Sequence, residues 1–306
     1  MRNVSDPGTL RFTVITATYN RAHLLPDLYD SLARQSYGPP EWLIVDDGST
    51  DGTERVVDEI SRRGDVPVRY IRQSNAGMVA ALNTAIEALP ARDFTLKVDD
   101  DDYLNPDALE HVARIWEGLS PSQRLDICCV AGLYTNEDGR VVGDRFPSDY
   151  HVSDYLRCRL EGGVSGDKCE VYRTTLLRQF RYPLLNGERR MPTSYIDLKM
   201  GQLYRTLYVN IPFGVQRNQD EGLTRQSVQI RKRSPHTSSF YYNELLAQPI
   251  RSPRLLLRAA LNYLRFSLHT GARLRRIFSG ANRNGLFVLL PIAYLLVLLD
   301  GVRDGS

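Results

Sequence analysis

One stretch of the sequence, FTLKVDDDDYLNP at residues 94–106, determines how the rest of the chain is interpreted. Its apolar beginning predicts a buried strand, and the four carboxylates of Asp99–Asp102 follow at the end of that strand. Asn105 and Pro106 are residue types that cap and open helices, so a helix is expected to follow as far as about Glu117. The acidic cluster is therefore expected at the carboxyl end of a strand, where open α/β sheets bind ligands.

The four adjacent carboxylates repel one another. Two unit charges about 4 Å apart interact by roughly 4 kcal/mol at an effective dielectric of 20, so the cluster needs a cation or wide exposure to water. In an extended segment, Asp99 and Asp101 point to one side and Asp100 points to the other. Two carboxylates on one side suit a hard divalent cation with oxygen ligands, most simply one that carries a diphosphate. A solvated acidic turn without a ligand is the competing interpretation.

Three strand–helix units precede the acidic strand. Strands are expected at 12–16, 41–45 and 68–71, and helices at 23–35, 53–63 and 78–88. Strands that alternate with helices indicate an α/β fold whose mostly parallel sheet is flanked by helices. Polar clusters follow the first two strands at Ala17–Arg21 and Asp46–Gly52. We expect them to converge with the acidic cluster at one edge of the sheet and to form a site.

The pattern changes after about residue 125. Strands are predicted at 125–133, 140–144, 207–211 and 215–217, and helices at 150–159, 171–179 and 194–204. We interpret residues 1–230 as one domain with halves at about 10–120 and 121–230, the second of which meets the second substrate. Residues 231–306 form a helical tail.

Composition is that of an ordinary globular protein, with 42% apolar and 25% charged residues. The four cysteines show no zinc-binding spacing, which favours a reducing compartment. Residues 1–10 are polar and lack the apolar core of a signal peptide. No nucleic-acid partner is expected.

The tail is basic and partly apolar. Residues 231–306 hold 12 Lys and Arg but 3 Asp and Glu, which points to an anionic partner. Its first helix is expected to carry a leucine face and an arginine flank: Leu257, Leu261, Leu264 and Leu268, with Arg254, Arg258 and Arg265. The apolar run Leu286–Leu299 is shorter than the roughly 20 residues that span a bilayer. It predicts a helix in the plane of an anionic membrane or a homodimer contact, and so a cytoplasmic protein held peripherally on the inner face of the plasma membrane.

Together, these clusters resemble family 2 glycosyltransferases of the GT-A fold. The resemblance is carried by Val14–Arg21, Leu43–Asp51, Asn75–Gly77 with Asn83, and Val98–Asp102. It is close over residues 12 to 117 and looser to about 230. Further motifs resemble a bacterial subgroup that often acts in surface-polysaccharide assembly: Gly166-Asp167, Arg181-Tyr182-Pro183, Gly187-Glu188 and Glu221–Thr224.

The resemblance implies a nucleotide-sugar donor, most simply a UDP-sugar, and a saccharide or lipid-linked acceptor. The residues it assigns to the nucleotide are Thr16, Thr18, Tyr19, Asn20, Asp47, Arg72, Asp99 and Asp100. Tyr19 would pack on a pyrimidine ring, and Asp47 would accept a hydrogen bond from the ring N3–H. Asp99 and Asp101 would hold Mn²⁺ or Mg²⁺, which acts as a Lewis acid on the leaving diphosphate. Arg72, Arg217 and Arg225 are candidate diphosphate clamps.

Inverting transfer also needs a carboxylate that takes the proton of the acceptor hydroxyl. The family places this base at the start of a helix in the second half, which makes Asp197 the first candidate. Related sequences often carry Glu where this chain has Thr193, so Glu188 and Asp167 stay as alternatives.

Other classes share parts of this pattern. A haloacid-dehalogenase-type phosphatase uses Asp-x-Asp after its first strand, whereas three strand–helix units precede it here. A sugar nucleotidyltransferase needs a Gly-rich loop after the first strand, and a Rossmann dehydrogenase needs G-x-G-x-x-G; neither is present. An inactive transferase that serves as a metal- or nucleotide-binding scaffold at the membrane is the non-enzymatic alternative.

Overall fold

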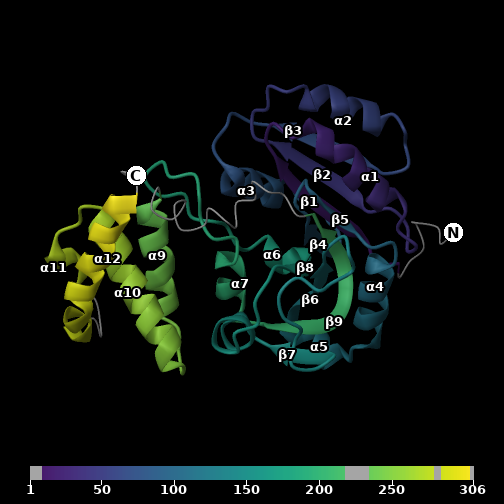
Figure 1. The fold of residues 1–306 in the computed structure, drawn as a ribbon. Helices are drawn as coiled ribbons and strands as arrows, with labels where there is room; N and C mark the ends of the chain where they lie inside the picture. Colours follow the sequence, from purple (N-terminus) through teal and green to yellow (C-terminus); the bar gives the residue numbers. More distant parts are fainter. Residues whose placement is uncertain (1–8, 218–233, 279–283, 304–306) are drawn as a thin grey trace. The chain divides into compact units, whose positions relative to one another are not determined.

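The computed structural model describes residues 9–217, 234–278 and 284–303. The chain divides into two compact units (Figure 1). The first contains the β-sheet, runs as far as Arg181 and resumes at Lys199. The second contains Tyr182–Leu198 and the C-terminal helices. The segment around the candidate base Asp197 therefore groups with the tail.

The first unit is built on a nine-stranded sheet of order β3-β2-β1-β4-β8-β6-β9-β5, with β7 paired to β9. The strands are β1 (Phe12–Thr18), β2 (Glu41–Asp46), β3 (Val68–Arg72), β4 (Phe94–Lys97), β5 (Asp102–Leu104), β6 (Ile127–Thr135), β7 (Tyr150–Ser153), β8 (Lys168–Arg173) and β9 (Arg205–Gln216). Strands β1 to β4 pair in parallel, whereas β8 pairs antiparallel with both β4 and β6. The predicted α/β fold is confirmed.

The helices of the first unit are η1 (Ala22–Leu24), α1 (Leu25–Ala33), α2 (Thr53–Ser61), α3 (Met78–Ala88), α4 (Ala108–Gly118), α5 (Pro121–Asp126), a π-helix η2 (Leu156–Glu161) and α6 (Thr174–Leu177). Helix α7 (Tyr195–Met200) begins in the second unit and ends in the first. Apolar residues of α1, α2 and α4 share one core with alternate residues of β1, such as Phe12 and Val14. Helix α3 contacts β1 and β2 but contributes no residue to that core. Because helices therefore bury both faces of β1 and β2, the sequences of these strands are nearly continuous apolar runs.

A buried polar contact joins β1 to its two neighbouring strands. The Thr16 hydroxyl accepts a hydrogen bond from the indole of Trp42, near the start of β2, at 2.9 Å and donates one to the carbonyl of Val98, directly after β4, at 2.9 Å. The Thr16 and Trp42 side chains are fully buried. Buried polar groups in a core are tolerated when each has a partner, as the Thr16 hydroxyl has here.

Five of the predicted elements differ from the structure in type or in bounds. Residues 140–144 contribute one isolated bridge, from Val141 to Thr135. The predicted helix at 150–159 is strand β7 followed by η2, and that at 171–179 is β8 followed by α6. The two strands predicted at 207–217 are one strand, β9. These segments are short, and short apolar runs do not separate helix from strand by periodicity; their pairing in the sheet decided the outcome.

The helix after the acidic cluster also starts later than predicted. Asp102–Leu104 pairs with β9 as β5, and the Asn105 side chain donates to the Pro212 carbonyl at 2.9 Å instead of capping. Helix α4 therefore begins at Ala108, with Asp107 at its N-cap position.

The second unit contains α9 (Pro235–Leu246), α10 (Pro253–His269), α11 (Leu274–Ile277), η3 (Asn284–Leu289) and α12 (Leu290–Arg303). Helix α10 packs on α9 and on α12, and Tyr242 of α9 stacks on Phe266 of α10 at 5.9 Å. On the predicted leucine face of α10, Leu264 is fully buried, Leu261 and Leu268 are half-buried, and Leu257 is exposed. Within the described residues, no helix is long and apolar enough to cross a membrane.

The contact between β6 and β9 gives a stability prediction. A Cβ atom on Gly132 would clash with the Phe213 ring, whereas one on Gly118 would meet nothing within 4 Å. Overpacking a core costs about 1–3 kcal/mol, so we expect Gly132→Ala to lower the free energy of unfolding by that amount. Gly118→Ala, at the end of α4, is the matched control and should not destabilise. Urea unfolding measures both; equal midpoints for Gly132→Ala and the unmodified chain would contradict this packing.

Candidate active site

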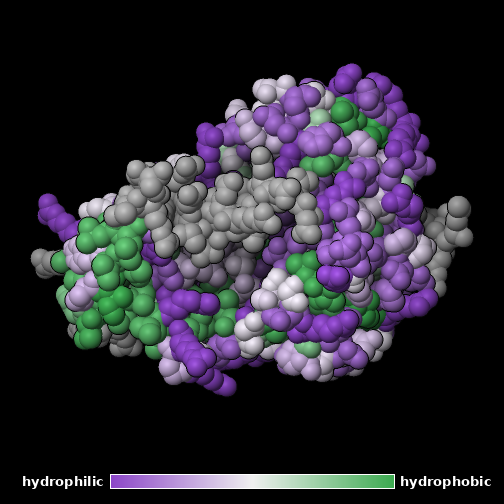
Figure 2. Space-filling model, viewed as in Figure 1, coloured by the Kyte–Doolittle hydropathy of each residue, from purple (hydrophilic) through white to green (hydrophobic). Residues whose placement is uncertain are grey.

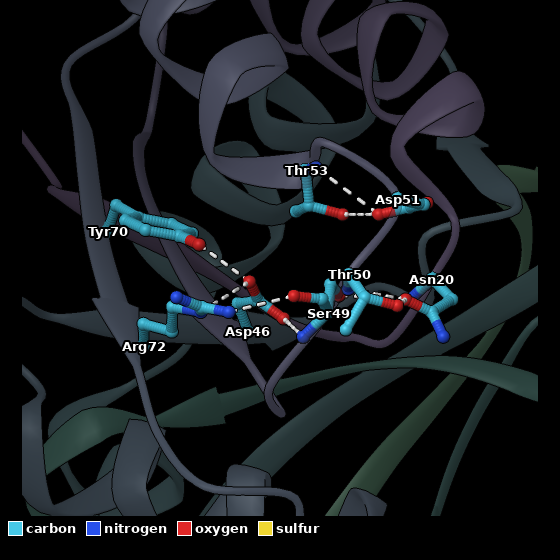
Figure 3. Close-up of polar contacts among 8 residues, drawn as sticks. All are labelled: Asn20, Asp46, Ser49, Thr50, Asp51, Thr53, Tyr70 and Arg72. Atoms are coloured by element: carbon cyan, nitrogen blue, oxygen red, sulfur yellow. Dashed lines mark hydrogen bonds and ion pairs between the residues drawn. The ribbon is translucent and has the colours of Figure 1, made fainter.

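The loops that follow β1 and β2 are bound to each other. The backbone N–H of Asn20 donates to the Ser49 hydroxyl at 2.9 Å, and the Thr50 N–H donates to the Asn20 side chain at 2.7 Å (Figure 3). Asn20 has a φ of 53°, a left-handed conformation that asparagine tolerates better than most residues. Asn20, predicted to contact the nucleotide, thus also sets the shape of the loop after β2.

Asp46, at the end of β2, organises the second loop and was not predicted as a site residue. Its buried carboxylate accepts hydrogen bonds from the Ser49 N–H at 2.8 Å and the Tyr70 hydroxyl at 2.6 Å (Figure 3). Burial and the bond to Asp46 raise the pKa of Tyr70 above its usual range, so Tyr70 stays a neutral donor. The half-exposed Arg72 donates to the Ser49 carbonyl at 2.8 Å and lies 3.8 Å from Asp46.

Asp47 holds the third loop, which leads into α3. Its carboxylate accepts hydrogen bonds from Gln73 Nε2 at 2.8 Å, the Ala76 N–H at 2.8 Å and the Gly77 N–H at 2.7 Å. Gly48 beside it has a φ of +84°, and a Cβ there would lie 3.0 Å from the Asn75 nitrogen. An ionised carboxylate offers about four acceptor positions, so about one on Asp47 stays available to a ligand. The buried Asp47 is therefore first a scaffold for the Asn75–Gly77 loop.

The acidic cluster lies in a turn between β4 and β5, with the Asp102 N–H bound to the Asp99 carbonyl at 3.1 Å. Within this turn, Asp99 is exposed and Asp101 is partly exposed, whereas Asp100 and Asp102 are buried. Asp100 accepts from the Thr18 hydroxyl at 2.7 Å and from Arg21 at 2.9 Å. The same Arg21 nitrogen lies 3.0 Å from Asp101. The more exposed pair is thus the one predicted to bind a metal.

The turn carries more negative charge than its surroundings compensate. Burial and then repulsion by Asp99 and Asp101 raise the pKa of Asp102 to about 8. Burial also raises the pKa of Asp100, although Arg21 and Thr18 oppose it. A bound cation at the exposed side of the turn would relieve this repulsion.

The residues present fit a metal that shares its coordination with a ligand. Among the described residues, no three His, Cys, Asp or Glu side chains meet as a closed metal centre. Mg²⁺ in phosphate-handling sites is bound by one or two carboxylates, substrate phosphates and water, so an all-protein cage is not required. Asp99 and Asp101 supply that smaller set.

The remaining nucleotide candidates differ in exposure. Tyr19 is an exposed aromatic beside the loops, available for stacking. Thr16 is fully buried, and both hydrogen bonds of its hydroxyl are made within the sheet. Its side chain therefore positions the site instead of facing a nucleotide.

The predicted clamps also differ. Arg217 is paired with Asp27 at 2.7 Å and Glu137 at 3.6 Å, and its guanidinium lies 5.3 Å from the centre of the Tyr103 ring. Arg225 lies outside the described residues.

The three candidate bases occupy different settings. Asp167 accepts from Gln216 at 3.1 Å and adds to the negative field at Asp102. Glu188 accepts from the N–H groups of His236 at 2.9 Å and Thr237 at 2.8 Å, at the start of α9. Burial would raise the pKa of Glu188, but the hydrogen bonds from Thr237 and His236 outweigh it and lower the pKa. Glu188 thus serves as a helix cap. Asp197 lies in the first turn of α7.

Sequence reasoning missed Arg21, Asp46 and Asp51. Asp51 accepts from the Ala22 N–H at 2.9 Å and the Thr53 hydroxyl at 2.6 Å, which ties the loop after β2 to η1. Arg21 could have been found from the sequence, because it is a basic residue in the loop after β1. Strand β1 pairs with β4, and the four carboxylates of Asp99–Asp102 follow β4. Asp46 and Asp51 flank the predicted Asp47 in one polar run and gave no separate signal.

Residues 13–179 match the family described as Glycosyl transferase family 2, and the chain belongs to that family. This result confirms the resemblance and replaces the phosphatase, nucleotidyltransferase and dehydrogenase alternatives.

Two curated relatives illustrate the match. Poly(ribitol-phosphate) β-N-acetylglucosaminyltransferase TarS of Staphylococcus aureus (strain MW2) is 29% identical over 171 residues, which are 55% of this chain and 28% of TarS. The putative glycosyltransferase EpsH of Bacillus subtilis (strain 168) is 25% identical over 207 residues, 65% of this chain and 58% of EpsH. The matched stretch therefore spans less than two thirds of either relative.

Solved structures share the fold. TarS residues 1–349 of S. aureus in complex with UDP-GlcNAc match with a TM-score of 0.62 and 22% identity, over 90% of this chain and 75% of that chain. The mannosyltransferase PcManGT of Pyrobaculum calidifontis in complex with GDP-Man and Mn²⁺ matches with a TM-score of 0.56 and 20% identity, over 99% and 85%. At these identities the likeness establishes the fold, which is the predicted GT-A fold.

The contacts of Arg21 give a prediction for the ligand-free chain. Hydrogen bonds to charged groups contribute about 1.5–3 kcal/mol to stability. In Arg21→Gln, the buried carboxylate of Asp100 loses its hydrogen bond from Arg21. We expect the free energy of unfolding of this variant to be about 1–3 kcal/mol lower than that of the unmodified chain in a buffer without divalent cations. The control is Arg55→Gln, since Arg55 is exposed and lies 3.9 Å from Glu59; surface pairs contribute roughly 0–1 kcal/mol. Urea unfolding compares the two, and equal stabilities would refute the role given to Arg21.

Proposed function

We propose that this chain transfers a sugar from a nucleotide-diphosphate donor, a UDP-sugar, to a hydroxyl of a saccharide or lipid-linked acceptor in the biosynthesis of a cell-surface polysaccharide or glycoconjugate. One observation carries the proposal. The loops after β1 and β2 are joined by hydrogen bonds, and the exposed Asp99 and the partly exposed Asp101 lie in the turn that follows β4. The complexes of TarS with UDP-GlcNAc and of PcManGT with GDP-Man and Mn²⁺ support a nucleotide-sugar donor.

The nucleoside is bound by the first two loops in this proposal. The exposed ring of Tyr19 stacks on the nucleobase. If the nucleobase is a uracil, its N3–H donates a hydrogen bond to the remaining acceptor position of Asp47. Thr18 and Asn20 fix the loop that carries Tyr19. The exposed Asp99 reaches the ribose or the metal.

The diphosphate is bound at the acidic turn. Asp99 and Asp101 hold Mn²⁺ or Mg²⁺, and the bound ion supplies Lewis-acid stabilisation of the leaving diphosphate. Arg21 and the half-exposed Arg72 place positive charge beside the same loops. Arg217 already has two acidic partners, so a clamp formed by Arg217 would first have to give these up.

Asp197 is the general base in this proposal. Its carboxylate takes the proton from the acceptor hydroxyl, whose oxygen bonds to the anomeric carbon while the bond to the diphosphate breaks; the anomeric configuration inverts. Asp197 lies in the first turn of α7, at the start of a helix in the second half of the chain, which is the place that the resemblance gives to the base.

The tail has its own place in the proposal. It would hold the chain on the inner face of the plasma membrane, where a lipid-linked acceptor is found. A homodimer formed through the same apolar residues is the competing arrangement.

The metal assignment predicts the behaviour of Asp101→Ala. This variant should lose Mn²⁺-dependent UDP binding in calorimetry, because one of the two exposed carboxylates of the turn is gone. Asp58→Ala, on the exposed side of α2, should bind UDP as the unmodified chain does. UDP affinity in Asp101→Ala that is unchanged with Mn²⁺ present would remove Asp101 from the site.

The base assignment predicts the behaviour of Asp197→Asn. Loss of a general base costs about 10²-fold or more in turnover, while UDP affinity should be unchanged. Glu188→Gln is the control and should lower the free energy of unfolding by about 0.5–2 kcal/mol through the α9 cap, with little effect on rate. A full rate in Asp197→Asn with a lost rate in Asp167→Asn would move the base to Asp167. UDP binding without transfer or donor hydrolysis in the unmodified chain would favour the inactive scaffold.

A further inference from the structure

The C-terminal helices carry an exposed apolar face. On η3 and α12, the exposed large apolar side chains that we call the outer face are Phe287, Val288, Ile292, Leu295, Leu298 and Leu299. Val288 is 81% exposed and Leu298 is 67% exposed. Val288, Ile292, Leu295 and Leu299 follow the spacing of one helical face. Figure 2 shows hydrophobic side chains gathered over these helices. Apolar surface of this extent marks an interaction site.

The opposite side of α12 explains why the outer face carries no charge. Asp300, an acidic residue of α12, is buried against α10. Its carboxylate is bound by Arg265, through Nε at 2.7 Å and through a second contact, and by His269 at 2.9 Å. Arg265 and His269 thus bind the Asp300 carboxylate inside the unit. The side chains of the outer face are aliphatic or aromatic.

The exposed charges around the described tail have one sign. Arg254, Arg258 and Arg273 are exposed, and Leu256 and Leu257 are exposed beside the first two. The acidic residues of the described tail are the buried Asp300 and the half-buried Glu244. The partner of this surface must therefore accept both apolar side chains and positive charge.

We propose that η3 and α12 lie in the plane of an anionic membrane, with the outer face among the acyl chains and the arginines at lipid phosphates. The inference deepens the proposed function. It rests on that function in one respect, which is that membrane binding would bring the enzyme to a lipid-linked acceptor. The sequence predicted a membrane role both for the arginine-flanked helix, now α10, and for the apolar run Leu286–Leu299; the inference assigns the apolar contact to η3 and α12, which contain that run.

Two alternatives fit the surface less well. Helix α12 has 14 residues and is about 21 Å long at 1.5 Å per residue, shorter than the roughly 30 Å of a hydrocarbon core. It can lie in the interface but not cross it. In a two-fold dimer the outer face packs on itself, and the described tail offers no exposed acidic residue to Arg254, Arg258 and Arg273. Anionic lipid attracts basic residues near its surface by about 1 kcal/mol each.

Flotation with vesicles tests the proposal. The full chain is mixed at low salt with vesicles of phosphatidylcholine alone or with added phosphatidylglycerol. We expect binding to the anionic vesicles, and a loss of roughly tenfold or more in Val288→Glu/Leu295→Glu, which places two charges on the outer face. Both side chains are exposed, so the double variant should keep its fold. Leu125→Glu, at an exposed leucine of the first unit, is the matched control and should float as before.

Three results would overturn the proposal: no flotation of the unmodified chain, equal flotation of the double variant, or equal binding to vesicles without anionic lipid. Sedimentation of the unmodified chain is measured in parallel. A dimer that the double variant converts to a monomer would assign the outer face to a second copy. UDP binding by calorimetry should be the same in all variants, so a failure of the membrane proposal is separate from a failure of the proposed donor site.

Discussion

The repulsion among the carboxylates of Asp99–Asp102 is the constraint on which the site depends. A chain can keep four adjacent acids at one strand end only where donors and positive charge compensate them. The structure provides Thr18 and Arg21 for Asp100, while burial and the neighbouring acids leave Asp102 with a raised pKa. Arg21 also lies 3.0 Å from Asp101, so one guanidinium is shared by two of the four carboxylates. That unbalanced charge is the physical reason to expect a cation with its diphosphate there.

The surrounding loops are held by carboxylates that accept hydrogen bonds from the loops themselves. The buried Asp46 at the end of β2 and the buried Asp47 after it bind the loops on either side, and the exposed Asp51 binds the start of η1. Because these bonds are made in the ligand-free chain, the loop that carries Tyr19 is arranged before a nucleotide arrives. A site ordered in this way loses less conformational entropy on binding.

The alternation of strands and helices up to residue 118 could be predicted because each element there is an apolar run bounded by turn residues, and α3 matched its predicted bounds. The elements from β7 to α6 could not, since Val171 and Tyr172 are strand residues only through their pairing with β4 and β6. For the site, residue types located the acidic turn, but Asp47 and Glu188 showed their structural contacts only in the fold. The burial of Leu264 and the exposure of Leu257 on α10 could not be predicted either, because amphipathicity shows that a helix has two faces but not which partner covers each of them.

Diffraction from crystals soaked with a UDP-sugar and Mn²⁺ tests the central claim most directly. The account predicts an anomalous manganese peak in contact with the Asp101 carboxylate and the diphosphate. It also predicts that the nucleobase of the UDP-sugar lies beside Tyr19. A bound nucleotide with no manganese at the acidic turn, or with the metal held elsewhere, would contradict it.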